Sequence, residues 1–522
     1  MKSHSKKLNR NKIRNPPFKK IPYYAYNVNL IGILALNQPR LNLGDYLNSP
    51  NFRTLTILMI SIVIIFLVRS IWTIPIEVAG DAVRKFYAAA EIVRTGDWAI
   101  LLQNHHTMRW SIVLPQAFIT WFFGTRYEVY YILPLLFFAL YFIIILYALK
   151  DHLNTSQKIL LAVLLFADPM SFRNSSQLMT AGPSIFYAIS ACYVLVTHSK
   201  RSSLAVILAA VLFFCAYGSQ ATYISFAAGG FLWLALIQRS WKPAFIFAGA
   251  LFGLLAIECL FFNYLSGWEL TFGRIEALLF GPHLEGLPGT ERYTVTFRQL
   301  FTRWLQLPVL DIALSTIFFI SGLVFVNLKK KPALPGFISC VYLVGVCFAL
   351  FASFAIMGID PIRPVQRLLP RYLAPFLPFA TIISVYFLTL IAASNRKVWD
   401  TRLVLFAALL ALSIIAIPQM YDHSQHPRIK IRTEAYIWKA DEEYTYFAKQ
   451  IHDGNLVYKG RKKFVVKMIT GFKYPDEKLS GKTIPSTTSR STEVKCVNKL
   501  VDIPSRLNVR ECKPGELKKI RT

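Results

Sequence analysis

The sequence is poor in charge, and this alone narrows the kinds of protein that it can encode. Charged residues make up 16% of its 522 residues, whereas about 25% is usual for a soluble globular protein. Apolar residues make up 54%, and the mean hydropathy is +0.42. Aromatic residues reach 14%, which excludes disorder over most of the length. We therefore expect an all-α polytopic membrane protein.

Several motifs that carry chemistry in other proteins are also absent. There is no Asp-x-Asp pair of the kind that chelates the cation of a nucleotide sugar, and no Gly-rich phosphate loop follows a strand, so we expect no nucleotide donor and no cofactor. There is no Cys-x-x-Cys pair. Five of the seven cysteines lie in apolar blocks, as small buried side chains do: Cys192, Cys215, Cys259, Cys340 and Cys347.

Positive charge is concentrated at the two ends of the chain. Residues 1–53 hold ten Lys and Arg against one acid, and residues 421–522 hold 22 against 12. The first 20 residues are polar and basic, without the apolar stretch of a cleavable signal peptide. This excess fits anionic lipid and phosphate better than nucleic acid. The predicted domains are a basic cytoplasmic tail with an interfacial segment (1–53), a transmembrane domain (54–420) and a small extramembrane α/β domain (421–522).

Eleven apolar blocks are candidate transmembrane helices, since a helix needs roughly 20 apolar residues to cross a bilayer. Nine are clear: 54–76, 127–149, 181–198, 221–238, 243–265, 307–327, 335–358, 372–393 and 402–420. Two are shorter: 157–168 and 203–217.

A further apolar block, 110–123, decides the predicted topology. It has only 14 residues, with Pro115 inside. If it lies at the interface without crossing, every short connector on the side of the N-terminus is basic, as cytoplasmic connectors usually are. Those basic residues are Lys150, Lys158, Lys200, Arg201, Arg239, Lys242, Lys329, Lys330, Lys331, Arg396, Lys397 and Arg402. The N-terminus is then cytoplasmic, and the outside segments are 77–126, 266–305, 359–371 and the tail from 421.

The first outside loop holds the candidate chemistry. Residues 82–94 have apolar positions on one face and predict a helix that lies along the membrane surface. Asp81 stands just before this helix, where a carboxylate caps free N–H groups, and Gly96 follows it as a C-cap. A capping role explains an aspartate at position 81 as well as a catalytic role does. The adjacent His105 and His106 make a poor zinc site, because no third ligand is near, so we expect no metal.

At these residues the chain resembles a known family. Asp81, Tyr87, Gly96 and a histidine segment at His105 resemble the first loop of the GT-C glycosyltransferases. The likeness is greatest to the protein O-mannosyltransferases and lipid A aminoarabinose transferases of glycosyltransferase family 39. Residues 369–378, LPRYLAPFLP, resemble the stretch that opens a late transmembrane helix in that family. The resemblance implies a GT-C-like fold of about 11 transmembrane helices with juxtamembrane helices after the first.

The resemblance also implies an activity: an integral-membrane glycosyltransferase that moves a sugar from a polyprenyl-phosphate donor to a lipid, glycan or protein acceptor. The reaction takes place on the extracytoplasmic face of a plasma or inner membrane. By resemblance Asp81 is the catalytic base, and outward basic residues stabilise the donor phosphate. The candidate phosphate ligands are Arg371, Arg109, Arg84, Lys85 and Arg367. Candidates for acceptor binding or orientation are Glu77, Asp168, His105, His106, Tyr87 and Tyr372. Asp168 could also simply end its helix.

Two other classes of protein remain open. An O-antigen polymerase or ligase also uses a polyprenyl carrier and relies on Arg and His in a late outside loop; here His283, Arg292 and Arg298 lie in such a loop. A lipid-linked glycan flippase or transporter has no need of Asp81 as a base. The near absence of acids within the apolar blocks, Glu258 apart, counts against proton-coupled transport.

The C-terminal domain contains two cysteines, Cys496 and Cys512. The predicted topology places this domain outside the cytoplasm, where thiols are oxidised. We therefore predict a disulfide between them.

Overall fold

The computed structural model of the protein describes residues 50–70, 81–126, 128–270, 272, 274, 304–305, 307–327, 335–354, 356–359, 362–364 and 373–394. The chain divides into two compact units, Met1–Ile57 and Leu58–Thr522. Helix α2 (Pro50–Ser70) begins in the first unit. All other elements belong to the second. The tail 1–49, the apolar block 402–420 and the predicted domain 421–522 lie outside the described residues.

Helices make up nearly all of the described chain. The α-helices after α2 are α3 (Asp81–Thr95), α4 (Trp110–Phe123), α5 (Val129–Ala148), α6 (Thr155–Ala167), α7 (Pro169–Ser176), α8 (Ala181–His198), α9 (Ser203–Ser219), α10 (Ile224–Leu232), α11 (Trp241–Leu265), α14 (Val309–Asn327), α15 (Gly336–Phe354) and α17 (Leu377–Ser394). Short helices are η2 (Trp98–Leu102), η3 (Ala221–Tyr223), η4 (Trp233–Ile237) and η6 (Ala374–Phe376). The strands within the described residues, β1 (Ile356–Ile359) and β2 (Ile362–Pro364), form one antiparallel pair in which Ile359 faces Ile362.

Three of the described helices are long and apolar enough to cross a membrane: α5, α8 and α11. Shorter apolar helices occur at 56–70, 110–123, 157–167, 203–219, 221–237, 309–325, 336–352 and 374–390. Helix α11 exposes large apolar side chains, among them Phe245, Phe252, Ile257 and Leu260. An apolar surface of this size is what lipid covers. The count of 11 transmembrane helices stays a prediction.

Most predicted helix boundaries agree with the structure. Residues 110–123 form α4 with the predicted bounds, and Gly96 ends α3 with a positive φ of 71°. Two blocks differ. The block 221–238 is not one α-helix, because η3, α10 and the π-helical η4 follow one another along it. The block 335–358 ends as α15 at Phe354, and its last residues enter β1.

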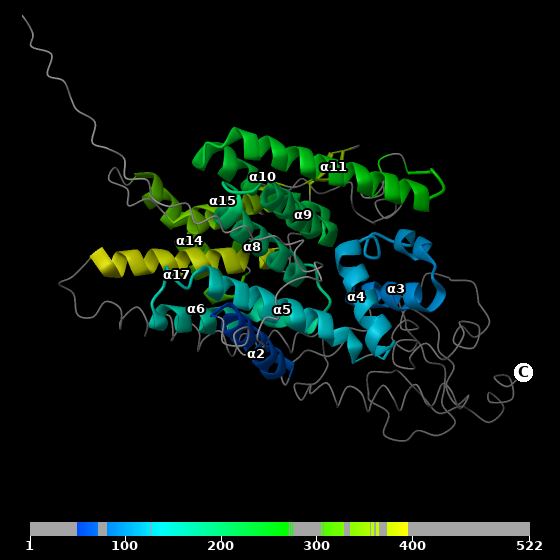
Figure 1. Cartoon of the computed structure of the whole chain (residues 1–522), viewed down its shortest axis with the longest axis horizontal. Coiled ribbons are helices and arrows are strands. Elements are labelled where there is room, and N and C mark those ends of the chain that lie inside the picture. Colours follow the sequence, from blue (N-terminus) through cyan, green and yellow to red (C-terminus); the bar gives the residue numbers. More distant parts are fainter. Residues whose placement is uncertain are drawn as a thin grey trace, which may run out of the picture. The chain divides into compact units, whose positions relative to one another are not determined.

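The helices pack as a bundle (Figure 1). Their buried apolar side chains form one large cluster and two smaller ones, and α3 and α4 contribute to the smaller two. Helix α8 packs between α5 and α9, α9 also contacts α11, α10 crosses α15, and α14 lies against α17. Aromatic rings tie three of these helices together. The Phe226 ring lies 4.8 Å from that of Phe348 and 5.4 Å from that of Phe379, measured between centroids.

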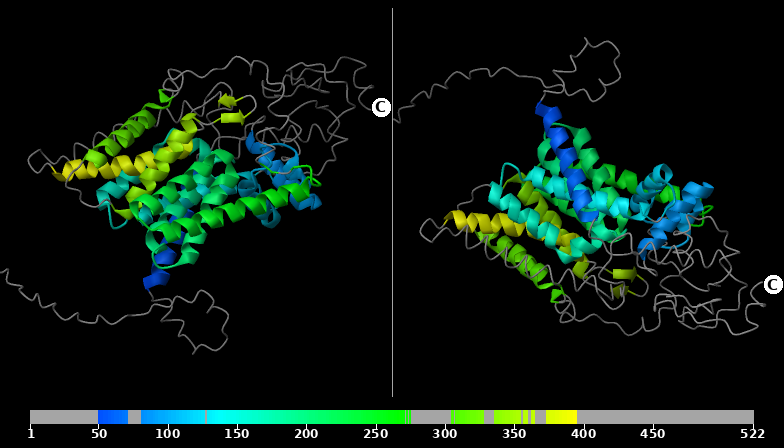
Figure 2. Two further views of the ribbon diagram at one scale, coloured as in Figure 1. Left: turned by 90° about the horizontal axis from the view of Figure 1, so that it is seen from above. Right: turned by 90° about the horizontal axis from the view of Figure 1, so that it is seen from below.

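Several helix ends meet on one side of this bundle. Ser111 Oγ lies 2.8 Å from Ser219 Oγ, which brings the start of α4 to the end of α9. The start of α8 reaches the same place, because Thr180 Oγ1 lies 2.9 Å from the hydroxyl of Tyr223. The start of α5 and the last third of α11 contact α4. Helices α3 and α4 therefore gather beside one set of helix ends (Figures 1 and 2).

Helix α3 is buried far more completely than a helix with one apolar face. Its buried residues include Ala82, Val83, Phe86 and Ala90 and also the charged Lys85 and Glu91. The reason is that α4 and η2 pack against α3, and Lys85 bonds to the segment after α7. The position of α3 along the membrane surface stays a prediction.

Candidate active site

Asp81 opens α3, and its side chain meets a histidine from the segment that leads into α4. Nε2 of His106 lies 3.1 Å from Oδ1 of Asp81. Asp81 is the first helical residue, one position later than a cap would be. Its side chain is 32% exposed, against 9% for His106. One carboxylate oxygen thus faces His106, while the side chain stays accessible from outside the protein.

The segment between η2 and α4 is a tight turn held by its own polar groups. Oδ1 of Asn104 accepts hydrogen bonds from the backbone N–H of His106, at 2.9 Å, and of Thr107, at 3.2 Å. The hydroxyl of Thr107 donates to the carbonyl of Leu101 at 3.0 Å. These bonds fix the backbone of His106 relative to the end of η2.

The geometry indicates that His106 is neutral. Burial lowers its pKa well below the ordinary value. The neighbouring groups that lower the pKa further are Arg109, His105, Lys85 and Arg84. The Asp81 carboxylate acts in the opposite direction, but burial and these groups outweigh it. Nδ1 of His106 is buried and has no hydrogen-bond partner within the described residues. The single ring proton therefore lies on Nε2 and is donated to Asp81.

Three basic side chains surround this pair and are held differently. Arg84 and Arg109 are half-buried, on the first turn of α3 and at the N-cap of α4 respectively. Lys85 is fully buried. Its Nζ donates to the carbonyl of Leu178 at 2.9 Å and to that of Asp81 at 3.2 Å. Arg84 and Arg109 are thus the cations that a bound anion could approach, while Lys85 bonds to backbone.

Two further predicted residues lie close by. Tyr87 is half-buried on α3, and His105 is half-buried with its ring centroid 3.7 Å from that of His106. Across the described part of the chain, no three side chains among His, Cys, Asp and Glu come together in a way that could hold a metal ion.

Asp168 lies apart from these contacts as the N-cap of α7. Its carboxylate accepts from the N–H of Met170 at 3.0 Å, the N–H of Ser171 at 2.9 Å and the hydroxyl of Ser171. It is buried and interacts with the buried Asp311 of α14. The Lys85–Leu178 bond comes from beyond the other end of α7, a helix about 12 Å long. The structure thus shows a cap at Asp168.

Several predicted residues lie outside the described part of the chain. They are Glu77, Arg367, Arg371, Tyr372, Cys496 and Cys512. The disulfide and the contribution of the late outside loop stay predictions.

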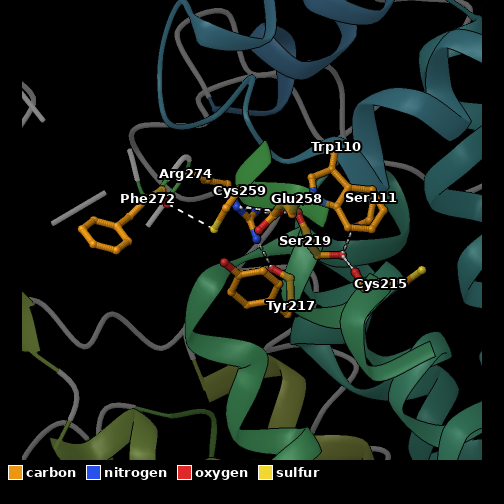
Figure 3. A network of polar contacts seen from close by, with 10 residues as sticks. Trp110, Ser111, Cys215, Tyr217, Ser219, Glu258, Cys259, Phe272 and Arg274 are labelled. Carbon is orange, nitrogen blue, oxygen red and sulfur yellow. Dashed lines mark hydrogen bonds and ion pairs between the residues drawn. The ribbon is translucent and has the colours of Figure 1, made fainter. Parts of the chain in front are cut away.

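A second polar network next to α4 was not predicted (Figure 3). Glu258 of α11 accepts a hydrogen bond from Nε1 of Trp110 at 2.5 Å and pairs with Nε of Arg274 at 3.1 Å. The terminal nitrogens of Arg274 donate to the carbonyls of Gly218 at 3.0 Å and Tyr217 at 3.1 Å. Glu258 was visible in the sequence as an isolated acid in an apolar block, which is the signal that a buried partner exists.

Comparisons with known proteins give a structural likeness. No protein-family model matches the chain, and no curated protein matches it. The chain is similar to the crystal structure of ArnT from Cupriavidus metallidurans bound to undecaprenyl phosphate. The two are 14% identical, the match covers 82% of this chain and 89% of that chain, and the TM-score is 0.47.

Proposed function

We propose that this protein is an integral-membrane glycosyltransferase that uses a polyprenyl-phosphate-linked sugar. One observation carries the proposal: a partly exposed carboxylate, Asp81, is held by a neutral histidine among cationic side chains, beside the ends of apolar helices. The long isoprenoid tail of such a donor lies within a bilayer, where apolar helices can contact it. The sugar and the acceptor are not specified by these residues.

In the proposed reaction Asp81 is the general base. An acceptor hydroxyl attacks the anomeric carbon of the donor, the bond from that carbon to the phosphate oxygen breaks, and polyprenyl phosphate leaves. The hydroxyl proton passes to the oxygen of Asp81 that does not face His106. A carboxylate within hydrogen-bond reach of the attacking hydroxyl is what this step needs. His106 keeps the carboxylate oriented.

Arg84 and Arg109 are the proposed phosphate ligands among the described residues. Charge develops on the phosphate as it leaves, and guanidinium groups stabilise it by charge-assisted hydrogen bonds. Arg371 and Arg367 remain proposed phosphate ligands. Lys85 is fully buried, so we propose that its charge acts on the phosphate from within the protein.

The shared side of the bundle supports the proposed topology. The starts of α5 and α8, the end of α9 and the last third of α11 gather around α4, the helix that follows the segment of His106. These are the helix ends for which the charge pattern predicts an outside location. We therefore propose that transfer occurs on the extracytoplasmic face, with a cytoplasmic N-terminus, an outside C-terminal domain and a Cys496–Cys512 disulfide.

The test is a transfer assay with the purified protein, radiolabelled polyprenyl-phosphate sugars and a lipid extract. We expect label to move from the donor to a new product. Asp81→Asn keeps the size of the side chain but removes proton acceptance, so the rate should fall about 10²- to 10⁴-fold.

Asp97→Asn is a suitable control, because it makes the same chemical change at an exposed acid that caps η2. Full transfer by Asp81→Asn would contradict the role of Asp81. Label that crosses the membrane on an unchanged donor would indicate a flippase, and growth of a glycan on its own carrier would indicate a polymerase.

A further inference from the structure

The network around Glu258 is built at the start of α4, directly after the residues of the candidate site. Figure 3 shows Glu258 between Arg274 and Trp110. Glu258 and Arg274 are both buried, with side chains 3% and 1% exposed. A buried carboxylate is costly without a partner, and here its partner is a guanidinium that is itself held by two carbonyls at the end of α9. The network therefore joins α11, α9 and α4.

The contacts of Trp110 leave it little freedom. Besides its bond to Glu258, its ring centroid lies 5.0 Å from that of Phe214. A Cβ at Gly218 would come within 2.6 Å of the Trp110 ring and 2.9 Å of the Cβ of Ser111. Only a residue without a Cβ leaves room for the side chains of Trp110 and Ser111 at this position. The hydroxyls of Ser111 and Ser219 meet 2.8 Å apart at the same crossing.

The first turn of α4 connects Trp110 to the residues of the candidate site. The carbonyl of Arg109 accepts from the N–H of Ile112 at 3.0 Å and of Val113 at 3.1 Å. Arg109 thus accepts the first backbone hydrogen bonds of α4, and it directly precedes Trp110 in the sequence. The turn at Asn104 holds His106, and it reaches the start of α4 through two backbone bonds, from the N–H of Met108 to the carbonyl of Asn104 at 3.2 Å and from the N–H of Trp110 to the carbonyl of Met108 at 2.9 Å.

We propose that Glu258 and Arg274 are positioning residues for the transfer site. They hold Trp110, and through it Arg109 and His106, in register with Asp81. Arg274 acts here from within the protein, through its ion pair and its two carbonyl bonds. This inference rests on the proposed function for its effect on catalysis, but the clamp itself is independent of that function.

The first measurement does not require that the protein transfers sugar. Trp110→Phe removes the N–H donor and keeps an aromatic ring, and Gly218→Ala moves the ring without removing any polar group. Amide hydrogen exchange of residues 106–113 should become at least about tenfold faster in both variants, as expected for loss of a hydrogen bond to a charged group.

Two matched controls separate this effect from general loosening. Trp233→Phe removes a similar bond, from Nε1 of Trp233 to Ser339 Oγ at 2.9 Å. Gly253→Ala adds a methyl group on α11 where no atom lies within 4 Å. Neither should change exchange in residues 106–113. Unchanged exchange in Trp110→Phe and Gly218→Ala would overturn the clamp, whether or not the protein transfers sugar.

The second measurement connects the clamp to catalysis by a double-mutant cycle. Trp110→Phe should raise the donor KM several-fold with a smaller change in kcat, and this effect should disappear when Arg109→Ala is already present. Independent, additive effects would overturn the link to Arg109. If the wild-type protein transfers no sugar, the proposed function fails, and the exchange measurement alone decides the clamp.

Discussion

Asp81 and Glu258 are two acids that contact the same short stretch of chain, and their surroundings are opposite. Asp81 meets His106, four residues before α4, whereas Glu258 meets Trp110, the first residue of α4. Asp81 has a neutral partner and is partly exposed. Glu258 has a guanidinium partner and is buried. The difference bears on the roles that we propose for the two acids: Glu258, which is paired with Arg274, holds structure, and Asp81, which is oriented by a histidine, takes the proton.

The comparison predicts opposite responses to removing each charge. Glu258→Leu leaves Arg274 buried without its carboxylate, so the free energy of unfolding should fall by about 3–5 kcal/mol. Asp81→Asn should change it by less than about 1 kcal/mol, because the amide oxygen can still accept the hydrogen bond from His106. Denaturation in detergent micelles measures both.

A double variant tests whether the lost stability comes from the unpaired charge of Arg274. Glu258→Leu combined with Arg274→Met removes both buried charges, and most of the lost stability should return. Equal destabilisation by Asp81→Asn and Glu258→Leu would remove the contrast between the two acids.

A smaller effect is expected from the partner of Asp81. In His106→Gln the amide nitrogen can occupy the position of Nε2 and still donate to Asp81, whereas His106→Asn cannot reach it. We expect His106→Asn to lower the transfer rate about 10- to 100-fold, which corresponds to one hydrogen bond to a charged group. His106→Gln should retain most of the rate. If both variants behaved alike, the bond to Asp81 would have no part in catalysis.

The last effect concerns the dependence of stability on pH. The pKa of His106 in the folded protein is lowered by burial and by the nearby basic groups, whereas an unfolded chain has a histidine pKa of about 6.5. Above that pH the side chain is neutral in both states and contributes no pH dependence. Below it the unfolded state binds the extra proton, so stability falls by up to about 1.4 kcal/mol per pH unit.

His106→Gln has no titrating ring, and its loss of stability between about pH 6.5 and 4.5 should therefore be shallower than that of the wild type. Carboxylates titrate in both proteins, so the difference between the two slopes is the quantity to compare. Parallel slopes would mean that His106 is charged in the folded protein.

Local features of this region could be predicted from the sequence. Gly96 marks the end of α3, and the 14 apolar residues of 110–123 form α4 with the expected bounds. These features depend on caps and apolar runs within a few residues. The extent of the burial of α3 could not be predicted, because it depends on how α4, η2 and the segment after α7 pack against it.

The network at Glu258 was missed for the same reason. Trp110 and Glu258 are 148 positions apart, and Arg274 bonds to carbonyls 56 and 57 positions away. Spacing in the sequence carries no information on such contacts. A lone acid in an apolar block indicates that a partner exists, but the packing of α4, α9 and α11 decides which residue it is. The break of the block 221–238 into three helical types likewise reflects packing and not composition.

The bond from Lys85 to Leu178 has a consequence for biosynthesis. The lysine is synthesised 93 residues before the carbonyl that it needs. At about 5–20 residues per second, the ribosome takes roughly 5–20 seconds to reach that carbonyl. During this interval α3 carries a cation without its final partner, so it cannot settle among apolar neighbours. The contacts that bury Lys85 next to Asp81 are therefore completed only after α7 has emerged, and a nascent chain that stops before residue 178 lacks the bond that holds this lysine.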